Sequence, residues 1–139
     1  MWSSKVMAQW TVKMDVEHQW YEELPEQCPP SDAFGLQEFV CYRLCASEAP
    51  QEQDFLSHRA LFPSKKFSTP ECQARAISVF TKPEDLDPVM KLAIHRQKAK
   101  VRIVLGREDG VAKKTGQNSH YSWWRSRSFQ MSSGTEESA

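Results

Sequence analysis

Four residues that lie far apart in the sequence carry side chains suited to acid–base and phosphate chemistry. Arg43 has a guanidinium group, which grips a phosphate or a carboxylate through parallel hydrogen bonds. His58 and His120 have imidazole groups, which exchange protons near neutral pH, and Ser78 has a hydroxyl group. If the fold gathers these side chains, we expect a catalytic site of the kind that cleaves RNA without a metal ion.

Arg43 stands out because the residues around it predict a strand over 39–44. On that strand Arg43 shares a face with Phe39 and Cys41, which is unfavourable for a cation unless it has a partner. A carboxylate such as that of Asp54 or Glu71 could pair with it, and a bound phosphate could do the same. Both interpretations stay open at this point.

A second candidate site is the cluster of aromatic and basic residues near the C-terminus. A strand over residues 119–124 places Trp123 and Trp124 on opposite faces, so they cannot both enter a one-sided core. Trp124 could then stack a base or a sugar while nearby cations bind phosphate. In the alternative interpretation, Trp123 fills the core and Trp124 covers a sheet edge. The residues of this predicted ligand-binding surface are Lys113, Lys114, Trp124, Arg125 and Arg127.

Charge is sorted along the chain although its total is zero. Residues 1–90 hold 8 Lys and Arg against 14 Asp and Glu, whereas residues 91–128 hold 10 against 2. Such asymmetry either holds two halves of a fold together or gives the molecule a face that attracts anions. The zero total argues against sequence-independent DNA binding, which depends on many phosphate contacts. A nucleotide, a nucleic acid or an acidic protein is the expected partner.

The four cysteines, Cys28, Cys41, Cys45 and Cys72, are too few and too irregularly spaced for a disulfide scaffold. We therefore expect free thiols in a cytoplasmic protein. A zinc ion held by four thiolates is disfavoured, because Cys41 and Cys45 would lie about 13 Å apart on an extended strand. The sequence has no phosphate-loop motif, no membrane-spanning stretch and no secretory signal, so it predicts no cofactor, metal or membrane association.

Alternating apolar and polar residues predict the strands of a sheet. The alternation is clearest over residues 10–17, and shorter stretches predict strands over 39–44, 76–80, 101–105 and 119–124. Asp109–Gly110 is a turn signal that predicts a hairpin after the strand at 101–105.

Helices are predicted between these strands. One runs from Pro50 to about Ala60, and two further starts have a hydroxyl residue shortly before Glu71 and before Glu84. The last of these helices continues to about Gln97. Strands near both ends, with helices between them, predict an α+β domain with a twisted, largely antiparallel sheet and two or three short helices. The predicted domain spans 1–127 with a Pro/Glu-rich loop at 22–33, and 128–139 form a disordered C-terminal tail.

These observations favour a small cytoplasmic binding or accessory domain that engages an anionic partner through its basic C-terminal third. The alternative is a small phosphate-handling enzyme, of the transferase or nuclease type, that acts on a nucleotide or RNA. The enzyme needs Arg43, Ser78 and His120 gathered in one concave pocket with a histidine of shifted pKa. The binding domain instead needs exposed basic and aromatic residues on a convex or flat patch. A third hypothesis is salt-sensitive self-association through the acidic and basic halves.

Overall fold

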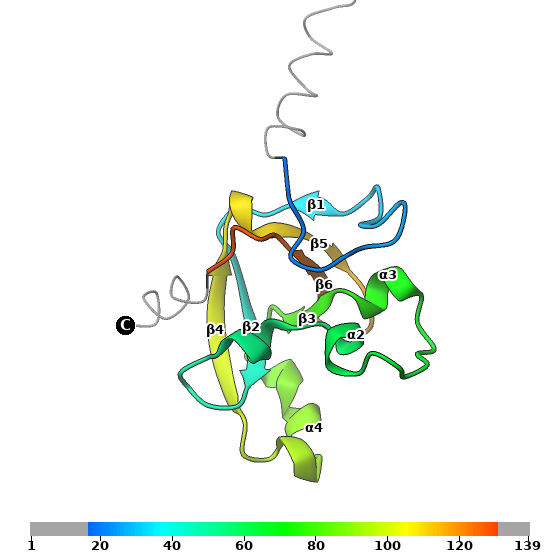
Figure 1. Ribbon diagram of the computed structural model, residues 1–139. Helices are drawn as coiled ribbons and strands as arrows, with labels where there is room; N and C mark the ends of the chain where they lie inside the picture. The colour runs from blue at the N-terminus through cyan, green and yellow to red at the C-terminus, as the bar shows by residue number, and fades with distance from the viewer. Residues whose placement is uncertain (1–16, 131–139) are drawn as a thin grey trace, which may run out of the picture.

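The computed structural model describes residues 17–130 and shows a six-stranded antiparallel sheet flanked by short helices (Figure 1). The strand order is β1–β5–β6–β3–β2–β4, and every neighbouring pair is antiparallel. The prediction of a single α+β domain with a largely antiparallel sheet is therefore confirmed. The strands are β1 (Phe34–Gly35), β2 (Phe39–Cys45), β3 (Ile77–Phe80), β4 (Ala99–Leu105), β5 (Gly110–Lys114) and β6 (His120–Arg125).

The short connection between β4 and β5 forces the sheet to curve. The two strands are four positions apart in the strand order, which would separate them by roughly 19 Å in a flat sheet. Residues 106–109 join them, and most of this segment is the 3₁₀ helix η4 (Arg107–Asp109), which rises only about 2 Å per residue. The ends of the sheet therefore approach each other, and Leu105 and Ala112 enter the same core. The hairpin predicted at Asp109–Gly110 is wrong, because the strands joined there do not pair.

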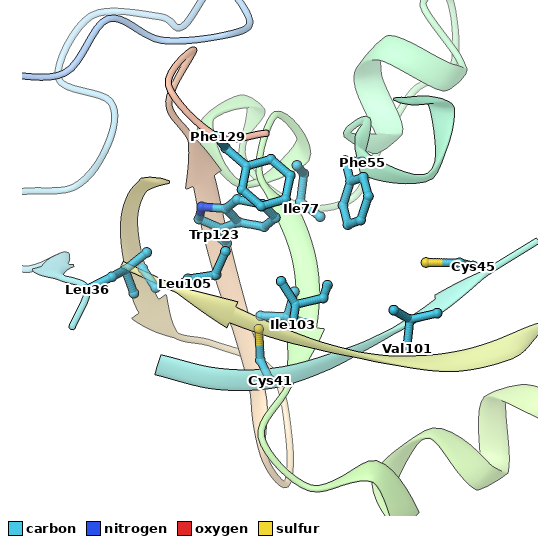
Figure 2. Packing of buried hydrophobic residues seen from close by; sticks show 12 residues of the cluster. Leu36, Cys41, Cys45, Phe55, Ile77, Val101, Ile103, Leu105, Trp123 and Phe129 are labelled. Carbon is cyan, nitrogen blue, oxygen red and sulfur yellow. The ribbon is translucent and has the colours of Figure 1, made fainter. Parts of the chain in front are cut away.

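The core lies inside this curve, on one face of the sheet (Figure 2). Alternate residues of the strands point into it, as a side-chain period of two requires. Trp123 packs edge to face against Phe55 and Phe129, with ring centroids 6.4 and 4.9 Å away, and these two rings come from outside the strands. The buried members of the core are Leu36, Cys41, Cys45, Phe55, Ile77, Val79, Val101, Ile103, Leu105, Ala112, Trp123 and Phe129.

The helix predicted from Pro50 to Ala60 is divided into two short pieces. These are the 3₁₀ helix η1 (Glu52–Phe55) and the helix α2 (His58–Leu61). Ser57 stands between them with an extended backbone, and its hydroxyl accepts a hydrogen bond from the backbone N–H of Ala60. A serine that caps a new helix ends the preceding one, because its own backbone leaves the helical region.

The helix predicted to continue to Gln97 is also interrupted. It forms η2 (Pro83–Leu86), α4 (Asp87–Met90) and, after a break, η3 (Ala93–His95). The break lies at Leu92, whose backbone is extended. Within residues 17–130, no helix has the length and the apolar composition needed to cross a lipid bilayer.

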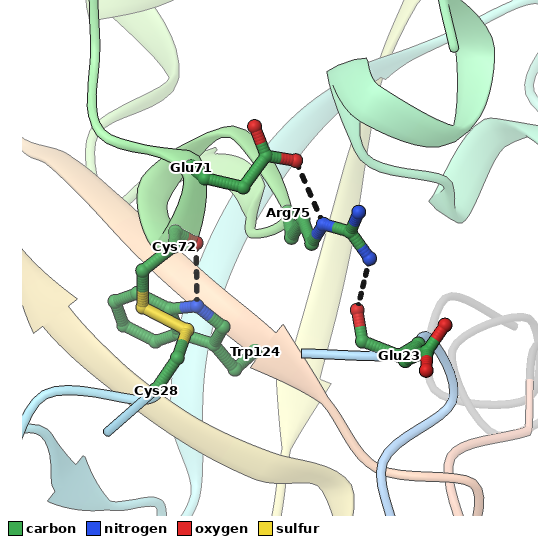
Figure 3. The surroundings of a disulfide bond; sticks show 6 residues. All are labelled: Glu23, Cys28, Glu71, Cys72, Arg75 and Trp124. Atoms are coloured by element: carbon green, nitrogen blue, oxygen red, sulfur yellow. Dashed lines mark hydrogen bonds and ion pairs between the residues drawn. A yellow bond between two sulfur atoms is a disulfide. The ribbon is translucent and has the colours of Figure 1, made fainter. Parts of the chain in front are cut away.

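Cys28 and Cys72 form a disulfide bond, which contradicts the expectation of four free thiols (Figure 3). Cys28 lies in the loop at 22–33, and Cys72 belongs to α3 (Glu71–Ala74), with the two Cα atoms 5.6 Å apart. Spacing in the chain carries no signal for this pair, because a disulfide needs two Cα atoms within reach and only the fold brings them there. Cys41 and Cys45 are free and buried, as expected.

Two predictions concern the ends of the chain. The strand predicted over 10–17 lies outside the described residues apart from its last position, and so do residues 131–139 of the predicted tail. Phe129 lies two residues beyond the predicted domain boundary at 127 and is only 3% exposed. The ordered packing therefore extends past that boundary.

Opening the Cys28–Cys72 bond is expected to lower the free energy of unfolding by about 2–4 kcal/mol, because the cross-link restricts the unfolded chain. Denaturant unfolding of the double variant Cys28→Ala/Cys72→Ala beside the wild type measures this difference. Thiol titration of the unreduced, denatured wild type should detect two thiols, those of Cys41 and Cys45. Four reactive thiols in that titration would show that the bond is absent.

Candidate active site

The candidate active site is built around a hydrogen bond between Ser78 of β3 and His120 of β6. The strand register pairs Ser78 with Ser122 and Phe80 with His120, so Ser78 and His120 are diagonal neighbours on one face of the sheet. Ser78 Oγ lies 2.9 Å from His120 Nε2. The neighbouring residues of β3 point to the opposite face, into the core. The alternation of β3 thus leaves the Ser78 hydroxyl free to meet the imidazole.

A second contact fixes the position of the proton on the His120 ring. Nδ1 lies 3.0 Å from the carbonyl oxygen of Thr115, which can only accept a hydrogen bond. Nδ1 therefore carries the proton, and Nε2 accepts the hydroxyl hydrogen of Ser78. Thr115 Oγ1 also lies 3.1 Å from Nδ1 and 2.8 Å from Ser122 Oγ. A nucleophile, a base and an orienting group are connected here, with a main-chain carbonyl where a carboxylate is more usual.

The turn between β5 and β6 holds the His120 ring in this position. Gly116 has a φ of +62°, and a Cβ atom at this residue would lie 2.9 Å from His120 Nδ1. On the other side, the backbone N–H of Ser119 donates to the carboxylate of Asp85, and its hydroxyl accepts from the backbone N–H of Lys82. The turn and the start of η2 therefore fix the imidazole together.

The electrostatic surroundings favour a neutral imidazole. Partial burial lowers the pKa of His120, the hydrogen bond to Thr115 opposes this, and the charge of Lys114 lowers it further. His120 is therefore neutral at pH 7, which is the form that a general base needs.

The surroundings of His58 also favour a neutral imidazole. Partial burial lowers the pKa of His58, and the charges of Arg43, Lys65 and His120 lower it further. Among residues 17–130, every charged group that shifts the pKa of either of these two imidazoles is basic. The charges that act on these two imidazoles would favour an anion beside them.

Arg43 is joined to the site through the main chain of Ser78. Its Nη1 donates to the Ser78 carbonyl at 2.7 Å, Nε to the Asp54 carbonyl at 2.6 Å, and Nη2 to the Leu56 carbonyl at 3.4 Å. Neither the Asp54 carboxylate nor that of Glu71 is a hydrogen-bond partner, so the hydrogen-bond partners suggested from the sequence are corrected to these three carbonyls. The charge of Asp54 still acts on Arg43 and opposes the lowering of its pKa by burial. Because each nitrogen already donates within the protein, Arg43 positions Ser78 and adds positive charge rather than clamping a ligand.

His58 is the first residue of α2, and Ser57 fixes the start of this helix. The backbone N–H and the hydroxyl of Ser57 both donate to the carboxylate of Glu22, at 3.0 and 2.6 Å. His58 remains exposed on one side, and its ring stacks on Phe67. Hydrogen bonds therefore join Arg43, Ser78 and His120. For His58, the fourth candidate, the charges of Arg43 and His120 help to lower its pKa.

Trp124 does not provide the exposed surface that the sequence suggested. Its side chain is 1% exposed, and its indole Nε1 donates to the Cys72 carbonyl at 2.9 Å, beside the disulfide (Figure 3). A tryptophan that is enclosed in this way has no face on which a base could stack. Trp123 fills the core, as the alternative interpretation held.

The basic residues of the C-terminal third differ in their surroundings. Arg125 is buried and pairs with Glu52 at 3.0 Å, and Lys113 pairs with Asp32 at 3.2 Å. Lys114 and Arg127 are exposed. The pairs of Arg125 and Lys113 join the basic third to the acidic first part of the chain, so sorted charge does hold two parts of the fold together.

Two residues of the site were not found from the sequence. Ser122 shares a face with His120 on the predicted strand, so the alternation of that strand could have identified Ser122 as a neighbour of His120. Thr115 had no signal, because its contact with His120 depends on the geometry of the turn. No protein-family model, curated protein or solved structure matches the chain.

Replacing Lys114 by Gln is expected to raise the pKa of His120, because one of the causes that lower this pKa is the charge of Lys114. Lys113→Gln is the matched control, since Lys113 is the neighbouring lysine and pairs with Asp32 instead. NMR titration of the His120 ring in both variants measures the effect. The same spectra should show the proton on Nδ1 at pH 7. A proton on Nε2, or equal pKa values in the two variants, would contradict this description.

Proposed function

We propose that this protein is a small phosphate-handling enzyme that cleaves or transfers a phosphate ester of a nucleotide or RNA. The observation that carries the proposal is the hydrogen bond of Ser78 Oγ to Nε2 of a neutral His120, whose Nδ1 donates to Thr115. A serine hydroxyl is a weak nucleophile unless a neighbouring base takes its proton. His120 has the position and the protonation state for this task.

In the first step, Ser78 Oγ attacks phosphorus while its proton passes to His120 Nε2. The bond from phosphorus to the leaving oxygen breaks, and that oxygen takes the proton from the imidazolium. Water, deprotonated by His120, then attacks the phosphoserine, and Ser78 Oγ regains a proton as it leaves. In a transferase, an acceptor hydroxyl replaces this water. The Thr115 carbonyl stabilises the imidazolium each time it forms.

The local charge supports a phosphate ester as the substrate. Arg43, Lys65 and Lys114 are the cations whose charges act on the two imidazoles. Cations near a bound phosphate stabilise its charge in both the bound and the transition state. In this proposal His58, which is exposed, donates a hydrogen bond to a phosphate oxygen or to a leaving group.

The hypothesis of a binding domain has less support. Of its five residues, Lys113, Trp124 and Arg125 have partners within the protein, and Lys114 and Arg127 are exposed. Binding of an acidic protein through this region stays a prediction. A cytoplasmic location also stays a prediction. It was expected partly from free thiols, and that argument is lost because disulfides such as Cys28–Cys72 are more common in oxidising compartments.

Removing the nucleophile or the base is expected to abolish most turnover of a chromogenic phosphodiester. Ser78→Ala and His120→Gln should each lower kcat/KM for bis(4-nitrophenyl) phosphate by about 100- to 10,000-fold. His95→Gln changes a histidine of η3, outside the site, and should retain the wild-type rate. The proposal fails if the wild type releases no nitrophenol, or if Ser78→Ala releases it at the same rate.

The rate should rise with pH and reach a plateau near neutrality, because His120 acts in its deprotonated form. Its pKa lies below the 6.5 that is usual for histidine, so the midpoint of kcat/KM should fall below pH 6.5. The same lowered pKa means that folding stability decreases as the pH falls below 6.5. Circular dichroism at each pH must therefore confirm that the protein is folded. A rate that falls from pH 5 to pH 7 would be inconsistent with a histidine base.

A further inference from the structure

Beside His58 the surface carries aromatic rings and a lysine that the proposed reaction leaves largely unexplained. Phe62 is 52% exposed, and Lys65 Nζ lies 5.5 Å from the centroid of its ring. Lys65 Nζ also lies 5.6 Å from the Phe67 ring, which stacks on the His58 imidazole with centroids 6.1 Å apart. These four residues, His58, Phe62, Lys65 and Phe67, are termed the aromatic platform.

Arg59 holds the aromatic platform in a fixed shape. Its Nη1 donates to three carbonyls of the loop, those of Phe62, Pro63 and Lys65, at 3.4, 2.6 and 2.9 Å. Its Nε and Nη2 donate to the two carboxylate oxygens of Glu71, at 2.8 and 2.9 Å. The loop is therefore ordered before any ligand arrives, which reduces the entropic cost of binding.

The aromatic platform offers an exposed ring and an ammonium group beside His58. These groups are complementary to the base and the phosphate of a nucleotide strand. A nucleobase has a flat π face that can stack on Phe62, and its phosphates are complementary to Lys65 and to the exposed Lys66. An acidic peptide would use the lysines and leave the ring without a flat partner. In a duplex the bases are stacked on each other, so a stacking site selects unpaired bases.

We propose that the aromatic platform stacks a base of single-stranded nucleic acid, with the adjacent phosphate at His58. The inference rests on the proposed function for the chemistry that follows binding. The binding itself does not require turnover, so the two proposals can be tested separately.

Fluorescence anisotropy of a fluorescein-labelled oligouridylate of about 10 nucleotides tests the binding. The full chain is used with Ser78→Ala throughout, so that the probe stays intact. Adding Phe62→Ala should weaken binding roughly 5- to 150-fold, because base–aromatic stacking is lost. Adding Phe62→Leu should also weaken it, since leucine keeps apolar bulk but has no π face. Lys65→Gln should make the slope of log affinity against log salt concentration shallower by about the contribution of one phosphate contact.

Ile94→Ala is the matched control, because Ile94 is 78% exposed and belongs to η3 rather than to the aromatic platform. This variant should bind as the parent does, and a duplex of the same length should bind more weakly than the single strand. Unchanged affinity in Phe62→Ala or in Phe62→Leu would overturn the inference. Phe62-dependent binding of polyglutamate, without binding of the oligonucleotide, would assign the surface to an acidic protein and overturn it as well.

The outcomes separate the two proposals. Phe62-dependent binding of the oligonucleotide by a protein without phosphodiesterase activity would retain the binding inference and reject the proposed reaction. Turnover of the small chromogenic ester without Phe62-dependent binding would retain the reaction and reject the inference.

Discussion

Arg43 hydrogen-bonds β2 to β3 and to the end of η1, and the elements around the site depend on it. Strands β2 and β3 are paired at one register position only, Tyr42 with Phe80. The next residue of β2 is Arg43, and its side chain donates to three carbonyls, one on β3 and two at the end of η1. Hydrogen bonds from a charged donor are worth about 1.5–3 kcal/mol each. One side chain therefore fixes η1 over the core, where Phe55 is buried, and sets the start of α2 with His58. The cation that looked misplaced on its strand is a structural link between three elements.

Because the sheet is curved, its inner face forms the core and its outer face carries the polar side chains of the candidate site. Strand β6 shows this most clearly, because Trp123 points into the core, whereas His120 and Ser122 point to the other face. Trp124 also lies on that other face, where its indole meets the Cys72 carbonyl next to the disulfide. The remaining part of this face is where polar side chains of β3 and β6 hydrogen-bond to one another. The candidate site thus belongs to the outer face of β3 and β6.

The sorted charge of the chain has two consequences in the fold. Arg125 of the basic third is paired with Glu52 of the acidic part, and its guanidinium lies 3.7 Å from the Tyr21 ring centroid. Because Arg125 is buried, loss of its partner would cost far more than loss of an exposed ion pair, which is worth about 0–1 kcal/mol. Burial lowers the pKa of His58 and of His120, and the charges of Lys65 and Lys114 lower the pKa of His58 and of His120, respectively, further.

The sequence by itself determined the class of fold, the approximate places of β2, β3, β4 and β6, and the residues with reactive side chains, because alternation and side-chain chemistry are local properties. It did not determine the strand order, the Cys28–Cys72 bond, the burial of Trp124 or the contact of His120 with Thr115. A strand has the same local pattern whichever strand lies beside it, and a cysteine or a tryptophan is the same residue whether covered or exposed. These features were decided only by tertiary structure, since each depends on which distant segment packs against the residue.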